Sequence, residues 1–102
     1  RYFSEETVKM FTSKQSDASR RGLGFDRWDP NSNNKYPSEL ASKETYGHTG
    51  YTGIGVWVDP ARDMIYIFLS NRVHPSVSEK LGNLAIRRRI QDVINKAIDK
   101  AE

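Results

Sequence analysis

The residues best suited to chemistry lie in a stretch that glycine interrupts repeatedly. Between Tyr46 and Asp59, glycine occupies positions 47, 50, 53 and 55, and the triplet His48-Thr49-Gly50 lies among them. An imidazole and a hydroxyl can both donate and accept hydrogen bonds, so the triplet could position or polarise a bound group. Glycine forfeits side-chain packing in a strand, which indicates that a ligand or another backbone approaches closely here. A bulged, twisted strand without any function would show the same spacing.

Other catalytic groups are scarce. The chain of 102 residues has no cysteine, which excludes disulfides, thiolate zinc sites and thiol nucleophiles within it. The two histidines, His48 and His74, are separated by an expected hairpin, so we expect no metal and no other cofactor. His74 precedes a proline in a connection, where a structural hydrogen-bonding role is the simpler interpretation. The pair Gly22 and Gly24 lacks the third glycine and the following helix of a dinucleotide fingerprint.

Charge and hydrophobicity limit the possible partners. With 16 Lys and Arg against 13 Asp and Glu, the net charge is +3. The basic run at 87–89 shares its segment with acidic residues, a pattern typical of a solvated helix face rather than of a nucleic-acid interface. No apolar run reaches the roughly 18–20 residues that span a bilayer. The opening at Arg1 has neither Met nor a signal peptide, and looks like the cut end of a longer polypeptide.

Local patterns predict a short helix at the start of the chain. Ser4 suits the N-cap, Glu5 and Glu6 suit the first turn, and Phe3 and Val8 have the spacing of a hydrophobic staple. We expect this helix to end between residues 11 and 14.

Three segments predict an antiparallel sheet of about three strands. They are residues 22–26, the glycine-rich stretch 46–59 and the apolar run 64–69, the last two being joined by a turn at 59–63. The continuous apolar run predicts a central strand that is buried on both faces. Residues 29–45, rich in turn formers, predict a long surface excursion.

The last segment predicts a long helix. Apolar side chains recur every three or four residues between 78 and 101, so we expect one amphipathic helix, or two helices broken near Arg87, with the apolar stripe packed on the sheet. The stripe consists of Leu81, Leu84, Ala85, Ile90, Val93, Ile94, Ala97 and Ile98. Residues 1–102 thus read as a single α+β unit. If the strand at 64–69 loses its cover in the isolated chain, self-association is expected.

The order of these segments resembles the C-terminal portion of β-lactamase-related serine hydrolases, a family of class C β-lactamases, DD-peptidases and related esterases. There, a Lys-Thr-Gly triplet lies on the strand that borders the active site. The sequence His48-Thr49-Gly50 is similar to the variant in which His replaces Lys. The segments that match in order are Arg21-Gly22-Leu23-Gly24-Phe25, Gly47-His48-Thr49-Gly50-Tyr51-Thr52-Gly53, Val58-Asp59-Pro60 and Phe68-Leu69-Ser70-Asn71-Arg72-Val73-His74-Pro75. The similarity extends from about residue 5 to residue 101.

The resemblance implies roles for four residues. His48 and Tyr51 become the catalytic contributors, the latter through a backbone N–H that is one of two oxyanion-hole donors. Thr49 and Gly50 become substrate contacts. Because His can be neutral where the family has Lys, ester or other acyl substrates are favoured over a β-lactam carboxylate. The implied substrates are small acyl or peptidoglycan-like molecules, and the implied location is the periplasm or another exported compartment of a bacterium.

The family's nucleophile is missing. It lies in Ser-x-x-Lys, followed by Tyr-x-Asn or Ser-x-Asn. Ser32-Asn33-Asn34-Lys35 matches both elements formally, yet it lies in a polar loop where nothing would desolvate the lysine. It also follows the Gly-Leu-Gly-Phe segment, whereas the two elements of the family come well before that segment. We interpret this match as coincidence. The chain alone is therefore expected to be inactive, and its first partner is the remainder of the parent hydrolase domain.

A different class of function stays open at this point. The chain could be a non-catalytic α+β module that binds cell-wall or carbohydrate ligands, including a domain appended to a glycoside hydrolase, or a basic partner-binding module. A Ser-x-x-Lys element in the upstream coding sequence would favour the hydrolase.

Overall fold

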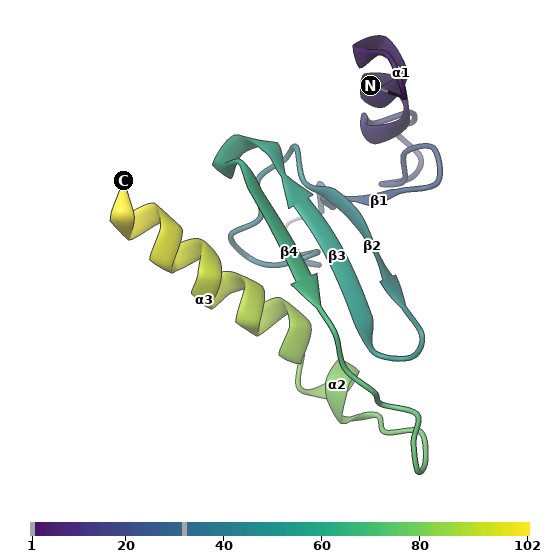
Figure 1. The fold of residues 1–102 in the computed structure, drawn as a ribbon, viewed down its shortest axis with the longest axis vertical. Coiled ribbons are helices and arrows are strands. Elements are labelled where there is room, and N and C mark those ends of the chain that lie inside the picture. The colour runs from purple at the N-terminus through teal and green to yellow at the C-terminus, as the bar shows by residue number, and fades with distance from the viewer. Residues whose placement is uncertain (1, 32) are drawn as a thin grey trace.

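The fold is α+β, with one antiparallel sheet of four strands and helices at both ends of the chain (Figure 1). The structure is a computed structural model that describes residues 2–31 and 33–102. The strands lie in the order β1-β2-β3-β4. The elements are α1 (Glu5–Thr12), β1 (Asp26–Arg27), β2 (Tyr46–Gly50), β3 (Ile54–Asp59), the 3-10 turn η1 (Pro60–Arg62), β4 (Met64–Phe68), α2 (Lys80–Asn83) and α3 (Ile86–Ala101). None of these helices is both long and apolar enough to cross a membrane.

The predicted first helix is confirmed. The Ser4 hydroxyl accepts a hydrogen bond from the Thr7 N–H at 3.2 Å, and two glutamates occupy the first turn. The helix ends at Thr12, and none of its residues is buried. It therefore depends on its cap and on contacts at one edge of the sheet.

The prediction of three strands was wrong, because the stretch 46–59 forms two strands. β2 and β3 are the arms of a tight hairpin whose turn is residues 51–53. The N–H of Gly53 donates to the Gly50 carbonyl at 3.1 Å. Gly53 has φ +106°, a conformation that side-chain-bearing residues rarely adopt. This glycine thus reverses the chain where the sequence suggested a continuous strand.

The predicted strand at 22–26 is also wrong in its placement. Only Asp26 of that segment pairs with β2, opposite Gly47. Gly24 has φ +80°, and the N–H of Gly22 donates back to the Phe25 carbonyl at 3.0 Å. The glycines therefore bend the chain before the strand begins.

β4 is an edge strand rather than the central strand that its apolar run predicted. Cross-strand partners share a face, so Trp57 and Tyr66 point to one side while Val56 and Ile67 point to the other. The first pair is buried, whereas Ile67 is 59% exposed. We call the second side the bare face; its exposed apolar residues are Ile54, Val56, Ile65, Ile67 and Leu69.

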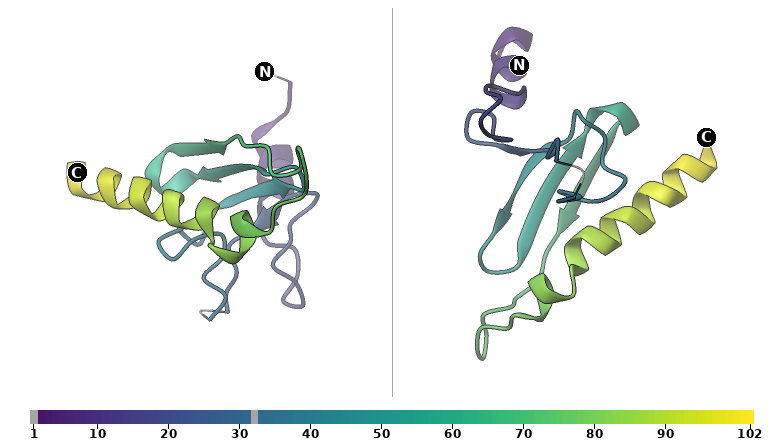
Figure 2. Two further views of the ribbon diagram at one scale, coloured as in Figure 1. Left: turned by 90° about the horizontal axis from the view of Figure 1, so that it is seen from below. Right: turned by 180° about the vertical axis from the view of Figure 1, so that it is seen from behind.

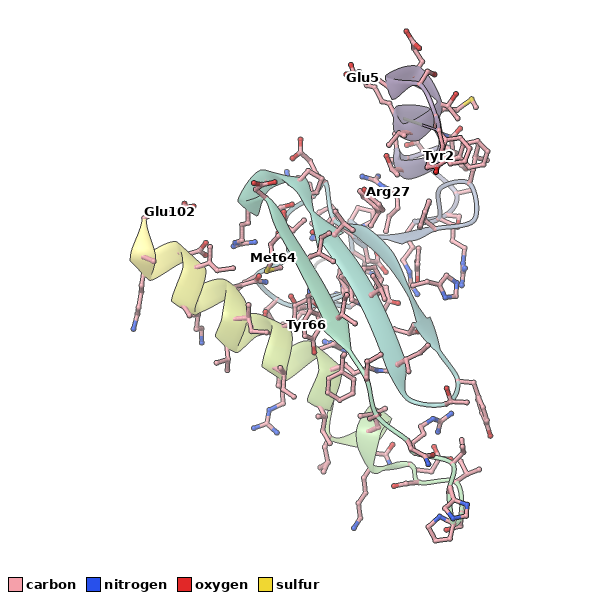
Figure 3. The ribbon with its side chains drawn as sticks, in the orientation of Figure 1. Tyr2, Glu5, Arg27, Met64, Tyr66 and Glu102 are labelled. Carbon is pink, nitrogen blue, oxygen red and sulfur yellow. The ribbon has the colours of Figure 1, made fainter. Side chains whose placement is uncertain are left out.

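The core lies on the other side of the sheet. Trp57, Met64 and Tyr66 form the buried cluster, and Figure 3 labels Met64 and Tyr66 between β4 and α3. The partly buried residues packed against this cluster are Tyr36, Phe68, Ile94 and Ile98. α3 and the long loop that precedes β2 lie on the same side of the sheet (Figure 2, left). The loop predicted as a surface excursion is therefore partly packed.

The C-terminal segment is two helices, as the second of the two expected arrangements proposed. α2 and α3 are separated at Ala85, which has φ +50°. The predicted contact face was partly wrong, because Gln91 and Asn95 are buried while Val93 is 68% exposed. Two polar contacts explain why a different face of α3 packs on the sheet. Asp92 accepts from the Leu40 N–H at 2.9 Å, and Asp99 pairs with Arg62 at 2.8 Å.

One buried ion pair joins the hairpin, the long loop and α3. The fully buried Asp59 carboxylate accepts from Ser42 Oγ at 2.6 Å and from Arg62 Nη1 at 2.8 Å. Arg62 also donates to the Leu40 carbonyl and to Asp99. Burial by itself raises the pKa of Asp59, but the hydrogen bonds from Ser42 and Arg62 lower it below its usual value.

Replacement of Arg62 should therefore be costly. Arg62→Met leaves the Asp59 carboxylate buried and unpaired, and should lower the free energy of unfolding by about 3–5 kcal/mol in urea titrations. Lys14→Met removes an exposed pair with Asp17 and should cost less than about 1 kcal/mol. Equal effects of the two changes would contradict this account.

The same carboxylate predicts a pH dependence. Because the folded-state pKa of Asp59 is lowered, its contribution is complete above the unfolded value of about 4 and is lost as the pH falls through the folded value. The acid decline in the free energy of unfolding should be shallower in Arg62→Met than in the unchanged chain.

The bare face predicts self-association of the isolated chain. Light scattering should give a mass above that of a monomer, and Ile65→Lys with Ile67→Lys should restore the monomer because two charges then lie on the bare face. Val93→Lys, a matched change of an exposed residue on α3, should leave the mass unchanged. A monomer for the unchanged chain would contradict the prediction.

Candidate functional site

The alternation of β2 separates the two side chains of the predicted triplet. His48 pairs with Val56 and lies on the bare face, whereas Thr49 pairs with Gly55 and points to the side of the core. The structure thus places His48 and Thr49 on one strand but on opposite faces. A ligand at the edge of β2 could therefore contact both side chains, but a ligand on one face could not.

Both ring nitrogens of His48 are held. Nε2 lies 3.1 Å from Nη1 of Arg21, and Nδ1 lies 2.7 Å from the Thr49 carbonyl oxygen. A guanidinium has donors only, so Nε2 accepts and the ring proton lies on Nδ1, which donates to the carbonyl. The imidazole is neutral in this arrangement, and its orientation is defined from both sides.

A buried carboxylate orders the chain next to Arg21. Asp26, 3% exposed, pairs with Arg20 Nε at 2.8 Å and accepts from the Tyr36 hydroxyl at 2.8 Å. The Arg20 guanidinium also lies over the Tyr36 ring, 3.9 Å from its centroid, and reaches Asp29 at 3.4 Å. These contacts fix the backbone from which Arg21 extends toward His48.

The pKa values of Asp26 and Tyr36 in this cluster differ from their ordinary values. Burial would raise the pKa of Asp26, but hydrogen bonds from Arg20 and Tyr36 lower it below its usual value. Burial and the Asp26 carboxylate raise the pKa of Tyr36 to about 12, against a lowering by Arg20 and Thr49. Thr49 therefore adjoins the Tyr36 hydroxyl on the inner side of β2.

The edge of β2 is open along the triplet. β1 pairs only with Tyr46 and Gly47, so within the described part of the chain no strand pairs with residues 48–50 on that side. An extended peptide could add there through main-chain hydrogen bonds. A side chain at position 50 would meet Ile54 at 2.5 Å, which gives Gly50 a packing reason as well.

Tyr51 lies in the hairpin turn and is 68% exposed. The Arg72 guanidinium lies 4.4 Å from the centre of its ring and donates to its carbonyl. Within residues 2–31 and 33–102, the Tyr51 N–H donates no hydrogen bond. This N–H is therefore available at the end of the open edge.

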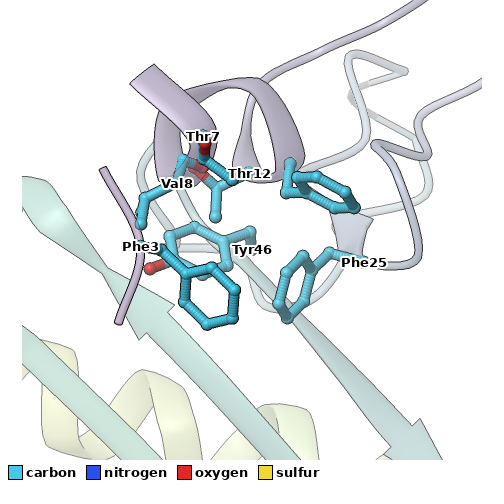
Figure 4. A pocket seen from close by; sticks show the side chains of 7 residues that line it. Phe3, Thr7, Val8, Thr12, Phe25 and Tyr46 are labelled. Carbon is cyan, nitrogen blue, oxygen red and sulfur yellow. The ribbon is translucent and has the colours of Figure 1, made fainter. Parts of the chain in front are cut away.

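An apolar cavity adjoins the same strand (Figure 4). Its volume is about 330 Å³, and its walls come from Phe3, α1, Phe25 and Tyr46. The Phe25 and Tyr46 rings meet edge to face with centroids 5.3 Å apart. Tyr46 lies two residues before His48 and on the same face, so the cavity borders the histidine end of the site.

Two other candidate segments lie away from this edge. Ser32 is outside the described residues, while Lys35 is exposed and pairs with Glu39. His74 lies in the connection after β4, where its N–H donates to Asn71 Oδ1 at 3.1 Å.

Sequence reasoning missed Arg21 and Asp26 as parts of the site. Arg21 begins the segment 21–25 that carries the resemblance and Asp26 directly follows it, but both precede His48 by more than twenty positions. The only sequence signal was the position of these residues beside the Gly-Leu-Gly segment, and that position does not show that Arg21 contacts His48 across the edge of the sheet.

Comparison with known proteins identifies the family. The profile of the family described as Beta-lactamase matches residues 2–90, which is most of the chain. The chain belongs to the β-lactamase family. The predicted resemblance is thus confirmed, whereas the roles of the His-Thr-Gly residues stay predictions. No solved structure matches the chain significantly.

Curated members of the β-lactamase family carry the same segment. A protein of Escherichia coli O157:H7 named "Putative D-alanyl-D-alanine carboxypeptidase" is 42% identical over 84 residues, and proteins of the same name from E. coli K12 and Salmonella gallinarum are 40% and 37% identical. In each comparison the alignment covers 79% of this chain and 19% of the relative. The chain spans about a fifth of the length of these relatives.

The hairpin turn that carries Tyr51 should be sensitive to one substitution. Gly53→Ala combines φ +106° with a Cβ that would lie 2.5 Å from Ser70 Oγ. It should lower the free energy of unfolding by about 1–3 kcal/mol, measured by urea titration.

The matched control for this change is Gly82→Ala. Gly82 lies in α2, and nothing lies within 4 Å of a Cβ built there, so the change should be neutral or stabilising. A Gly53 variant as stable as the Gly82 variant would contradict the turn geometry.

Proposed function

We propose that this chain is the C-terminal part of a serine hydrolase domain that cleaves peptidoglycan-type substrates ending in D-alanyl-D-alanine, through an acyl-enzyme. The observation that supports it most is the rim formed by β2. An oriented imidazole, an open strand edge and an unpartnered N–H follow one another from His48 to Tyr51. Family membership and the names of the relatives favour a hydrolase over a non-catalytic module.

The rim would act on the acyl group in three ways. The substrate backbone adds to the open edge beside Gly50, which fixes its carbonyl. The Tyr51 N–H donates to the oxyanion that forms when the carbonyl is attacked; loss of a comparable donor costs about 10²–10³ in rate. His48 donates or accepts at the scissile group only after its contact with Arg21 rearranges, so we assign it a positioning role before catalysis.

The nucleophile would come from the rest of the parent domain. The chain spans 19% of its relatives, which leaves ample sequence for a serine and its activating lysine. The bare face adjoins His48, and we infer that the missing part of the domain covers this face and delivers the serine beside it. The resemblance to β-lactamase-related hydrolases also implies that the parent is an exported bacterial protein.

A covalent probe tests the proposal. A fluorophosphonate or a penicillin should not label residues 1–102 alone, whereas the full-length protein should be labelled once per active site. Labelling is read by intact mass and peptide mapping. Labelling at Ser32 of the isolated chain, or no labelling of the full-length protein, would overturn the proposal.

The oxyanion role needs a different measurement, since a backbone N–H cannot be deleted by an ordinary substitution. Tyr51→Pro in the full-length protein removes this N–H and should lower kcat by about 10²–10³. Tyr51→Ala keeps the N–H and should retain most of the rate, while circular dichroism checks that both variants fold. Equal rates for the two variants would contradict the assignment.

A further inference from the structure

The outer side of α3 carries a narrow apolar seam, which consists of Ile86, Ile90, Val93 and Ala97. These residues lie four, three and four positions apart, so their side chains follow one side of the helix. Ile90 is 39% exposed, Val93 is 68% exposed, and Ala97 is exposed as well. In the part of the chain that the structure describes, no other helix runs alongside α3 (Figure 1). The seam is therefore an apolar surface without a cover.

Contacts on other sides of α3 hold the seam in this outward position. Asp92 accepts from the Leu40 N–H at 2.9 Å, and Asp99 pairs with Arg62 at 2.8 Å. At the start of the helix, the Arg87 guanidinium donates to a carbonyl oxygen of β3 at 2.8 Å. A rotation of α3 that buried the seam against the sheet would break all three contacts. The outward direction of the seam thus belongs to the fold.

The flank of the seam is basic. The two aspartates of α3 turn away to their partners, whereas Arg89 and Lys96 border the seam seven residues apart. Neither of these two cations forms an ion pair within residues 2–31 and 33–102. In a pair of packed helices, charges at this spacing beside an apolar seam face the flank of the partner and select its charge.

An open groove of about 550 Å³ covers this face of α3. The first three residues of the seam line it together with Arg89 and Lys96. The acids at its border are already bonded, because Glu39 pairs with Lys35 and Asp92 accepts from two N–H groups of the long loop. The groove therefore offers apolar contact and positive charge along a helix, which suits an amphipathic helix as its occupant.

We propose that the seam is the docking surface for an acidic amphipathic helix that the rest of the parent domain supplies. The inference rests on the proposed function for the existence of that domain, and the chain covers only 19% of its relatives, which leaves room for such a helix. The strict spacing fits another helix, whereas a helix that lies in a lipid surface has a broader apolar face. A second copy of this chain would bring the same basic flank and be repelled. The parent domain would then hold the sheet from both sides, at the bare face and at the seam.

Cysteine labelling in the full-length protein tests the docking. Val93→Cys is introduced after any native cysteines outside residues 1–102 have been replaced by serine, and its reaction with a maleimide is followed by intact mass. The rate should be about ten- to hundredfold lower in the full-length protein than in residues 1–102 alone, the factor expected for burial of one aliphatic side chain. Equal rates would overturn the inference.

The basic flank has its own test in the same background. Arg89→Glu with Lys96→Glu should raise the labelling rate of Val93→Cys in the full-length protein about three- to tenfold, since two ion pairs become two repulsions. The matched control is Lys9→Glu with Lys14→Glu, which reverses two exposed charges far from α3 and should leave the rate unchanged. An equal effect of the two pairs, or no effect of the first, would overturn the assignment of an acidic helix.

Other occupants give different results. Protection of Val93→Cys that requires vesicles of phosphatidylglycerol, or that disappears on dilution together with a dimer seen by light scattering, would overturn the inference in favour of a lipid surface or a second copy.

Failure of the proposed function is distinguishable from failure of the docking. Protection of Val93→Cys in a full-length protein that neither a penicillin nor a fluorophosphonate labels would retain the docking surface and overturn the hydrolase. Labelling by either probe, with Val93→Cys as reactive as in residues 1–102 alone, would retain the hydrolase and overturn the docking surface.

Discussion

The buried carboxylate of Asp26 is the constraint on which the site depends. It joins Arg20 to the Tyr36 hydroxyl, and it lies in the short strand that pairs with β2. Arg20 in turn fixes the chain from which Arg21 reaches His48, and Tyr36 packs on Trp57 in the core. A carboxylate this buried is stable only while its partners stay in place, so the core, the strand edge and the exposed cation are coupled through one group.

The two sides of the sheet differ in how they are covered. Its covered side has a core of aromatic residues, a packed loop and a helix, tied together by Asp59 and Arg62. Its bare face carries exposed aliphatic side chains, and under the proposed function the rest of the parent domain covers them. The rim from His48 to Tyr51 borders this bare face, so the candidate site and the exposed apolar surface lie together. This arrangement fits a chain that completes an active site with residues supplied from elsewhere.

The pairing of a neutral imidazole with an arginine separates orientation from charge. A lysine combines both in one flexible side chain, whereas here the imidazole of His48 and the guanidinium of Arg21 are two groups in contact at 3.1 Å.

The sequence by itself determined the family, the first helix with its Ser4 cap, the hairpin of β3 and β4 around η1 and the break in the C-terminal helix. Each of these follows from local signals: a capping side chain, turn residues, a hydrophobic period and an ordered set of short motifs. The tertiary structure decided the rest. It showed that Gly53 reverses the chain, that β4 is an edge strand, and that polar contacts such as the one to Asp92 decide which face of α3 packs on the sheet. It also brought Arg21 to His48, because contacts between distant residues arise from the pairing of strands and the burial of Asp26, which no local pattern encodes.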